Sequence, residues 1–248
     1  MPAEPMRFIT VDLATKEITE TEFHQEDYGY FGGRGIVAKL MTEYCDPNCD
    51  ALGPDNILIF TTGYFAGTAL STANRLSIGG KSPLTGGIKE SNSGGTMSRR
   101  MTDHRIKVIL FKHQSPDWVY CYVDKQGQVH LEDATDLVGM WTYATCDEFR
   151  RRYNDRVAIS CIGPAGERLA RTGSIMSAEM LRLAAEPLAQ HDTRGRRAAP
   201  HAREWRWGAG LVVGIARTSR TWGAGFVVSP AAGSQAARQA LLWRRQTT

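Results

Sequence analysis

The sequence contains no long hydrophobic run and no segment that resembles a secretory leader. No apolar stretch among its 248 residues approaches the ~18 residues that a membrane-spanning helix needs. The N-terminal stretch MPAEPMRFITVD lacks a basic segment followed by an apolar one, which marks a secretory signal. With 42% hydrophobic residues, the chain can still bury the core of one large domain or two small ones. We therefore expect a protein of the cytoplasm without a membrane partner.

Cysteine is scarce, and its five residues are an odd number that does not suit a disulfide framework. Cys45 and Cys49 form a C-x3-C pair, which two interpretations fit: ligands of a zinc or iron–sulfur site, or two thiols in a turn made by Pro47 and Asn48. No second pair or histidine follows nearby, which favours the turn. The six histidines are scattered, and no serine lies in a nucleophile elbow, so no catalytic set is indicated.

Acidic residues and lysine become rare after residue 180. The segment 181–248 has eleven arginines, no lysine, three acidic residues and four of the six tryptophans. Arginine with interleaved tryptophan can bind nucleic acid, and a disordered tail is a second interpretation. A third is a GC-rich coding region read out of frame, which yields this excess of Arg, Ala, Gly and Trp. The composition favours the third interpretation and makes nucleic acid the weakest candidate partner.

Before that segment, short strands and a few helices follow one another without regular alternation. This pattern predicts an α+β fold with mixed sheets rather than a doubly wound sheet, in a domain over 1–180 followed by an irregular or disordered segment over 181–248. The predicted elements are a hairpin over 7–23, a helix from about Arg34, a buried strand within 55–68, strands within 105–113 and 117–133, a helix within 136–153 and a strand within 156–167.

The stretch FGGRGIVAKL joins a glycine-rich segment to the first predicted helix. Gly32, Gly33 and Gly35 let backbone amides approach a ligand closely, and the helix would present its N-terminal N–H groups. Arg34 adds a positive charge with bidentate donor geometry. The dinucleotide fingerprint G-x-G-x-x-G is absent, and no apolar strand precedes the glycines. Tight packing of a helix entry is the alternative interpretation.

A second glycine-rich stretch, NRLSIGGKSPLTGGIKESNSGGTM, carries isolated cations among small polar residues. Arg75 and Lys81 supply the charge, Asn92 supplies an amide, and Gly94 and Gly95 permit backbone N–H groups to face an anion. The Walker spacing of a P-loop is absent. We expect these glycine-rich loops to bind a polyanionic organic ligand that carries phosphate.

Several motifs occur together in an order that is specific for one family. They are GGRG before a helix, LGPDNILIFTTGYFAGT, R-x5-KSPLTG, SNSGG, GQVHLEDATDLVG and ISCIGPAGE, and they span residues 6–180. In these motifs the sequence resembles the aldehyde:ferredoxin oxidoreductase family, which are tungsten enzymes built on a bis-pterin cofactor. The resemblance implies an α+β base domain whose sheets lie beneath the two pterins.

The resemblance also implies cofactor-binding residues. Arg75 would hydrogen-bond the pterin, and the backbone carbonyl of Asn92 would ligate the magnesium that bridges the pterin phosphates. Ser93, Gly94 and Gly95 would line the same loop. The remaining matched positions, with roles that the motifs do not define, are Arg34 and Lys81. The cofactor implied is a tungstopterin or molybdopterin with magnesium.

The implied activity is oxidation of aldehydes to carboxylic acids, with electrons passing through a [4Fe–4S] cluster to ferredoxin. The family's cluster cysteines lie downstream in helical domains, and Cys45 and Cys49 do not match them. We therefore expect an N-terminal fragment, truncated by a frameshift or an early stop and inactive by itself. The alternatives are a non-catalytic module that binds a pterin or phosphate ligand and a basic-tailed nucleic-acid binder.

Overall fold

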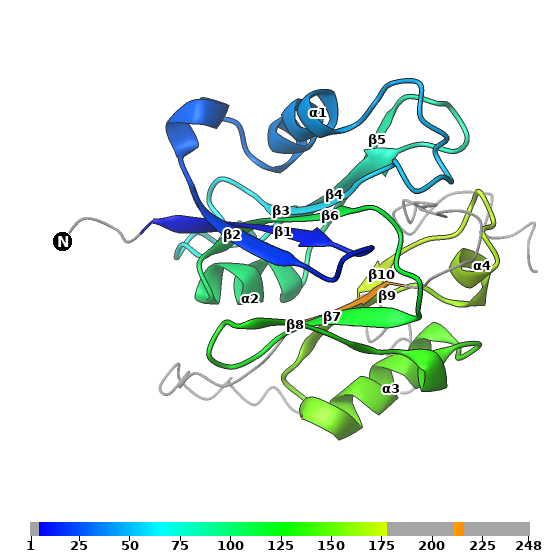
Figure 1. Cartoon of the computed structure of the whole chain (residues 1–248). Helices are drawn as coiled ribbons and strands as arrows, with labels where there is room; N and C mark the ends of the chain where they lie inside the picture. Colours follow the sequence, from blue (N-terminus) through cyan, green and yellow to red (C-terminus); the bar gives the residue numbers. More distant parts are fainter. Residues whose placement is uncertain (1–4, 178–210, 216–248) are drawn as a thin grey trace, which may run out of the picture.

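The computed structural model of the chain describes residues 5–177 and 211–215, which form an α+β fold (Figure 1). Six strands make a mixed sheet, sheet A, in the order β2–β1–β6–β3–β4–β5. Strand β1 runs parallel to β6, and the other neighbours run antiparallel. The strands are β1 (Met6–Asp12), β2 (Ile18–Phe23), β3 (Leu58–Thr62), β4 (Leu76–Lys81), β5 (Ile88–Ser93) and β6 (Ile106–Lys112).

Five strands make a second mixed sheet, sheet B, in the order β10–β9–β11–β7–β8. Strand β11 lies between β9, to which it is parallel, and β7, to which it is antiparallel. The hairpin of β7 and β8 turns at Gly127, which has a positive φ of 83°. The strands are β7 (Val119–Val123), β8 (Val129–Asp133), β9 (Ala158–Cys161), β10 (Met176–Ser177) and β11 (Leu211–Ile215).

The prediction for the segment 181–248 was wrong at the five positions of strand β11, Leu211–Ile215. The sequence analysis expected an irregular or disordered segment there, but LVVGI pairs in the middle of sheet B. The physical reason is the run of β-branched residues, which favours a strand with neighbours on both sides. The other residues of 181–248, with all three interpretations of their composition, lie outside the described residues.

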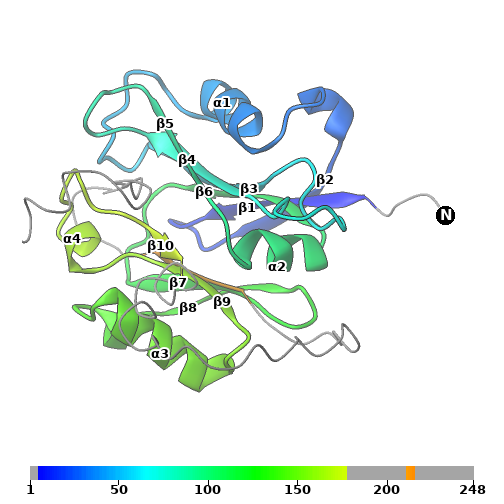
Figure 2. The same ribbon diagram turned by 180° about the vertical axis from the view of Figure 1, so that it is seen from behind.

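The helices cover the outer faces of the two sheets and join them. Helix α1 lies on sheet A, helix α3 lies beneath sheet B, and α2 contacts β3 and β6 of sheet A as well as β9 of sheet B (Figures 1 and 2). In the part of the chain described, no helix has the length and apolarity that crossing a bilayer requires. The helices are η1 (Gln25–Tyr28), α1 (Gly33–Tyr44), α2 (Met97–Asp103), η2 (Thr135–Leu137), α3 (Thr142–Tyr153) and α4 (Pro164–Glu167).

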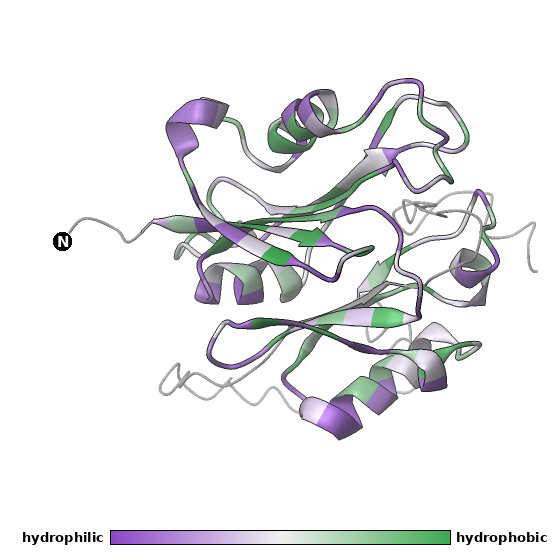
Figure 3. Ribbon diagram, viewed as in Figure 1, coloured by the Kyte–Doolittle hydropathy of each residue, from purple (hydrophilic) through white to green (hydrophobic). Residues whose placement is uncertain are grey.

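Three hydrophobic clusters fill the spaces between these layers. The first, with Phe60, Phe111 and Met101, lies between the sheets and around α2. The second, with Val37, lies between α1 and sheet A, and the third, with Phe149, lies between α3 and sheet B. Apolar colour follows the facing sides of helices and sheets, while the outer face of α3 is hydrophilic (Figure 3). The predicted helix from about Arg34 is confirmed as α1.

The sequence analysis treated the stretch 74–97 as a glycine-rich loop, and this prediction was wrong. The stretch contains the β4–β5 hairpin and leads into α2. Gly79 and Gly80 lie inside β4, where a Cβ atom on Gly79 would overlap the side chain of Val37 from α1. A Cβ atom on Gly80 would lie 2.8 Å from the carbonyl oxygen of Ile57. These two glycines therefore allow close packing, not backbone approach to an anion.

A lysine is buried at the start of β6. Lys107 is 5% exposed, and its Nζ donates to the carbonyl of Gly63 at 3.2 Å. Its ammonium also lies near the rings of Phe23 and Tyr64, at 5.9 and 6.0 Å from the ring centroids. Burial disfavours the charged form and lowers the pKa of Lys107 from 10.5 to about 8. At neutral pH the fold therefore buries an ammonium group whose lost hydration is only partly replaced by contacts with the protein.

Gly79→Ala is expected to destabilise the protein by about 1–3 kcal/mol, because the added methyl group overpacks the contact with buried Val37. Gly87→Ala is the matched control, because its Cβ would meet only Thr85 Oγ1 at 3.8 Å. It should change stability by less than about 0.5 kcal/mol. Urea denaturation measures both variants, and equal midpoints for the two would contradict the packing role of Gly79.

The stability of the wild type relative to Lys107→Met should rise between about pH 8 and pH 10.5. In this window the unfolded chain still binds the Lys107 proton and the folded chain has lost it, so raising the pH favours folding. The full rise is on the order of 3–4 kcal/mol, since one pKa unit corresponds to about 1.4 kcal/mol. Denaturation of both proteins at a series of pH values measures the difference, which would stay constant if Lys107 had an ordinary pKa.

Candidate functional site

The N-terminal end of α1 lies directly on strand β4. Gly33 is placed over Ser77 so closely that a Cβ atom on the glycine would overlap the Ser77 hydroxyl. Gly32 occupies the N-cap position and has no side chain to cap the helix. The first N–H groups of α1 therefore point away from the helix without an intrahelical partner. Together with the helix dipole, they favour negative charge at this end of sheet A.

Five side chains form a continuous hydrogen-bonded row beneath this helix end. Arg34 Nε donates to Glu90 Oε2 at 3.0 Å, and Ser77 Oγ donates to Glu90 Oε1 at 2.7 Å. Asn92 Nδ2 donates to Ser77 Oγ at 3.2 Å, and Arg75 Nε donates to Asn92 Oδ1 at 2.6 Å. We call Arg34, Glu90, Ser77, Asn92 and Arg75 the polar row. It links the helix that follows GGRG to the strands of the second glycine-rich stretch.

The strand register explains why these residues meet. Ser77 of β4 pairs directly with Asn92 of β5, so their side chains lie on the same face of the sheet. Glu90 lies two residues before Asn92 and points to the same face, because side chains alternate along a strand. The opposite face receives Ser93, whose Oγ is buried and has no hydrogen-bond partner within the described residues.

The remaining predicted residues fall into two groups. Gly94 lies beside the polar row, since a Cβ atom there would be 3.4 Å from a terminal nitrogen of Arg75. Gly95 has a positive φ of 104° and turns the chain from β5 into α2. Lys81 lies apart at the far end of β4 and is 7% exposed. Its Nζ donates to the carbonyls of Pro47 and Cys49, each at 2.5 Å, so the ammonium holds the 45–49 turn.

Sequence reasoning missed Glu90 and Ser77. The side chain of Glu90 is 9% exposed, whereas that of its partner Arg34 is 81% exposed. The polar row therefore holds two arginines and one carboxylate, with a formal net charge of +1. The signal that could have found Glu90 is the E-x-N spacing in KESNS, which places both side chains on one face if the segment is a strand.

Exposed aromatic side chains lie next to the polar row. Tyr30, Phe31, Tyr64 and Phe65 are between 42% and 89% exposed. The ring of Tyr64 contacts those of Tyr30 and Phe65 edge to face, with centroids 6.5 and 5.0 Å apart. A Cβ atom on Gly32 would lie 3.0 Å from the Tyr64 backbone nitrogen, which brings these rings to the start of α1. A flat ligand could pack against them.

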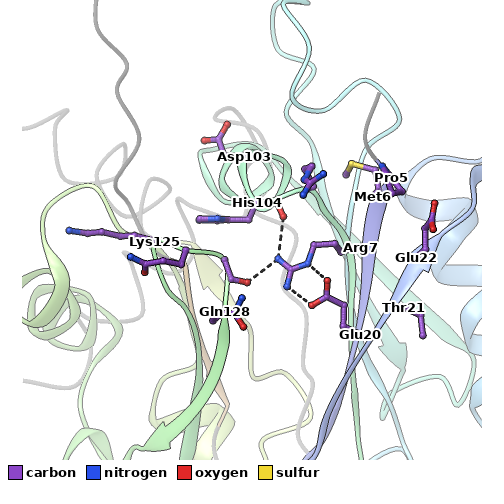
Figure 4. A pocket seen from close by; sticks show the side chains of 13 residues that line it. Pro5, Met6, Arg7, Glu20, Thr21, Glu22, Asp103, His104, Lys125 and Gln128 are labelled. Carbon is purple, nitrogen blue, oxygen red and sulfur yellow. Dashed lines mark hydrogen bonds and ion pairs between the residues drawn. The ribbon is translucent and has the colours of Figure 1, made fainter. Parts of the chain in front are cut away.

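A separate cavity of about 630 Å³ lies between the edges of the two sheets and contains none of the predicted site residues (Figure 4). Arg7 is at its centre and pairs with both carboxylate oxygens of Glu20. The same guanidinium donates to the carbonyl of Gly127 at 2.9 Å. Because the Glu20 carboxylate neutralises Arg7, whereas the polar row keeps a formal net charge of +1, this cavity offers less to an anion than the polar row does.

The described residues supply donors for an anion but no obvious metal ligands. Within 5–177 and 211–215, no three His, Cys, Asp or Glu side chains lie together as a metal-binding group. The helix N-terminus, Arg75 and the close approach at Gly94 fit the phosphate groups of an organic cofactor. The exposed aromatic rings fit its ring system. The site is thus suited to holding a cofactor rather than to acid–base chemistry by its own side chains.

Comparison with known proteins places this chain in a family. The sequence model described as "Aldehyde ferredoxin oxidoreductase, N-terminal domain" matches residues 8–217. A tungsten-containing aldehyde ferredoxin oxidoreductase of Thermococcus kodakarensis is 35% identical over 173 residues, which are 69% of this chain and 28% of that protein. The protein of the same description from Pyrococcus furiosus is 34% identical over the same shares of both chains.

A solved structure is also similar. The active-site complex BamBC of benzoyl coenzyme A reductase, in complex with 1,5-dienoyl-CoA, aligns with a TM-score of 0.66 and 28% identity, over 69% of this chain and 26% of that chain. This chain spans 28% of the length of the curated relatives above. Since the family match covers well over half of its residues, the chain belongs to the aldehyde ferredoxin oxidoreductase family, in which it corresponds to the N-terminal domain.

Proposed function

We propose that this chain supplies the cofactor-binding base of an oxidoreductase that oxidises aldehydes to carboxylic acids and delivers the electrons to ferredoxin. Family membership supports the proposal, because the aligned relatives are tungsten-containing aldehyde ferredoxin oxidoreductases. The chain matches 28% of their length. The activity of the whole enzyme, its aldehyde and its ferredoxin partner are therefore parts of the proposal.

The observation that carries the proposal is the polar row beneath the N-terminus of α1. Arg34 and Arg75 stand at the two ends of the row, and the N-terminus of α1, which has no side-chain cap, lies on the strand that carries Ser77. Phosphate accepts hydrogen bonds from helix N-terminal amides and from arginine. A pterin that carries phosphate combines the anion and the flat ring that these two groups of residues would bind.

The proposed roles follow the positions of the side chains. Asn92 orients Arg75, which donates to the pterin ring, and the Asn92 backbone carbonyl ligates the magnesium that neutralises the phosphates. Ser93 and Gly94 form the wall of the same loop, and Gly95 turns it toward α2. A tungstopterin or molybdopterin held there would supply the two-electron oxidation. The side chains of this domain bind and orient the cofactor and keep water from its phosphates.

The proposal also covers the electron relay, the location of the enzyme and the bounds of the domain. A [4Fe–4S] cluster adjacent to the pterin would relay electrons, and we assign none of its ligands to this chain. We propose a cytoplasmic enzyme, with neither a membrane nor a nucleic acid as partner. Its pterin-binding domain would comprise residues 1–180, with strand β11 added to sheet B.

A non-catalytic binding module is the second candidate function. The feature that favours it is the completeness of the polar row, in which every side chain already has a partner from this chain alone. Such a row needs no further domain to keep its shape. It could therefore bind a pterin phosphate without supporting oxidation.

Arg75→Gln should weaken the binding of an oxidised pterin phosphate, with magnesium present, by at least about tenfold, because it removes one charge-assisted hydrogen bond of roughly 1.5–3 kcal/mol. Glu90→Gln should strengthen binding by about threefold, because the Arg34 guanidinium then loses its ionic partner and is free for phosphate. Fluorescence titration of the pterin measures both affinities.

Arg151→Gln is the matched control for this titration. Arg151 is an exposed arginine of α3 that is paired with Glu148, on the far side of sheet B. Its substitution should leave the affinity unchanged. Equal loss of affinity in the Arg75 and Arg151 variants would contradict a specific site at the polar row and indicate general attraction by positive charge.

The purified chain should not reduce a viologen dye when an aldehyde is added, even where it binds the pterin phosphate. A bis-pterin needs walls on both sides to exclude water, and the polar row provides one. The assay follows dye reduction under anaerobic conditions, with dithionite as the positive control for the dye. Aldehyde-dependent reduction by the chain alone would contradict this expectation.

A further inference from the structure

The Cys45 and Cys49 thiols lie side by side at the C-terminal end of α1. Their Sγ atoms are 3.6 Å apart, and both cysteines are free. A disulfide has an S–S length of ~2.05 Å, so closure would need the two sulfurs to move together by roughly 1.5 Å. Cys45 is 8% exposed, whereas Cys49 is half-buried and therefore more accessible to a small reagent.

The turn between the two thiols is held in place by a buried lysine. Lys81 Nζ donates to the carbonyls of Pro47 and Cys49, each at 2.5 Å. Within the turn, the N–H of Asn48 donates to Asp46 Oδ1 at 2.8 Å and the N–H of Cys49 donates to the Asp46 carbonyl at 3.1 Å. Because these bonds restrict the turn, each thiol stays at a high effective concentration for the other.

A second cysteine pair provides an internal contrast. Cys146 of α3 and Cys161 of β9 have Sγ atoms 3.9 Å apart, but each residue is only 1% exposed. The hydrogen bond between the Cys146 and Cys161 thiols, together with burial, raises the pKa of the Cys161 thiol. A dissolved reagent therefore meets the Cys49 sulfur before it meets either sulfur of the second pair, although both pairs are close enough to react once reached.

We infer that Cys45 and Cys49 form a thiol–disulfide exchange site, at which a small-molecule disulfide of the glutathione class oxidises the pair to a Cys45–Cys49 disulfide. Forming this disulfide requires only the two cysteine sulfurs from the protein. A structural zinc site, in contrast, needs four ligands, and the described residues bring no group of three His, Cys, Asp or Glu together. The inference is independent of the proposed function.

The exchange proceeds in two balanced steps. The Cys49 thiolate attacks one sulfur of the small disulfide, forms a mixed disulfide and releases one thiolate. Cys45 then loses its proton and attacks the Cys49 sulfur, which closes the intramolecular disulfide and releases the second thiolate. Two protein thiols are oxidised, and one small disulfide is reduced to two thiols. Burial raises the pKa of the Cys45 thiol above its usual value, so the second step should accelerate as the pH increases.

The test treats the folded full chain with oxidised glutathione and then quenches, unfolds and alkylates it for peptide mass spectrometry. The expected result is a Cys45–Cys49 link, with the other three of the five cysteines alkylated. Cys45→Ser should accumulate a glutathione adduct on Cys49, because the resolving thiol is absent. Cys49→Ser should carry at least tenfold less adduct on Cys45, because that sulfur is buried.

Cys146→Ser is the matched control and should form the Cys45–Cys49 link at the wild-type rate. Prior formation of a Cys146–Cys161 link would overturn the inference, as would five alkylated cysteines after treatment. An adduct found mainly on Cys45 would overturn the assigned order of attack. Circular dichroism of each variant, recorded before treatment, establishes that the compared proteins are folded.

Discussion

The close contact between α1 and strand β4 is the constraint on which the candidate site depends. Gly33 lies over the Ser77 side chain and Gly79 lies against the Val37 side chain, so at each point a glycine leaves the space that the facing side chain fills. The contact brings the first turn of α1 down to the level of the polar side chains of β4 and β5. Larger residues at these positions would lift the helix and separate Arg34 from Glu90. The anion binding that we propose at the helix end would thus be a consequence of packing.

Every side chain of the polar row has a hydrogen-bond partner before any ligand arrives, and the row keeps a formal net charge of +1. Glu90 accepts from Arg34 and from Ser77, and Asn92 accepts from Arg75. Ser77 is buried and connects the two halves, because its hydroxyl donates to Glu90 and accepts from Asn92. A phosphate would compete with Glu90 for Arg34 but would leave the Arg75–Asn92 contact in place. In its proposed role, the row would therefore favour ligands that carry both an anion and a group for Arg75.

Residues of one type serve different purposes within the same stretch of sequence. Gly79 allows packing, Gly86 takes a positive φ of 70° in the β4–β5 turn, and Gly94 leaves room for Arg75. Cations differ in the same way, since Arg75 joins the polar row and Lys81 holds the turn that carries Cys49. Composition alone does not separate these roles, because each depends on which element packs against the residue.

The sequence by itself determined the fold class, the first hairpin, the start of α1 and the family, because these follow from local hydrophobic periodicity, turn residues and the order of motifs. It also identified Arg34, Arg75 and Asn92 as candidates. Only the tertiary structure decided that β4 and β5 are strands and that β11 lies in sheet B. Pairing between distant segments sets strand register, and register, not sequence spacing, placed Ser77 opposite Asn92 and brought Glu90 within reach of Arg34.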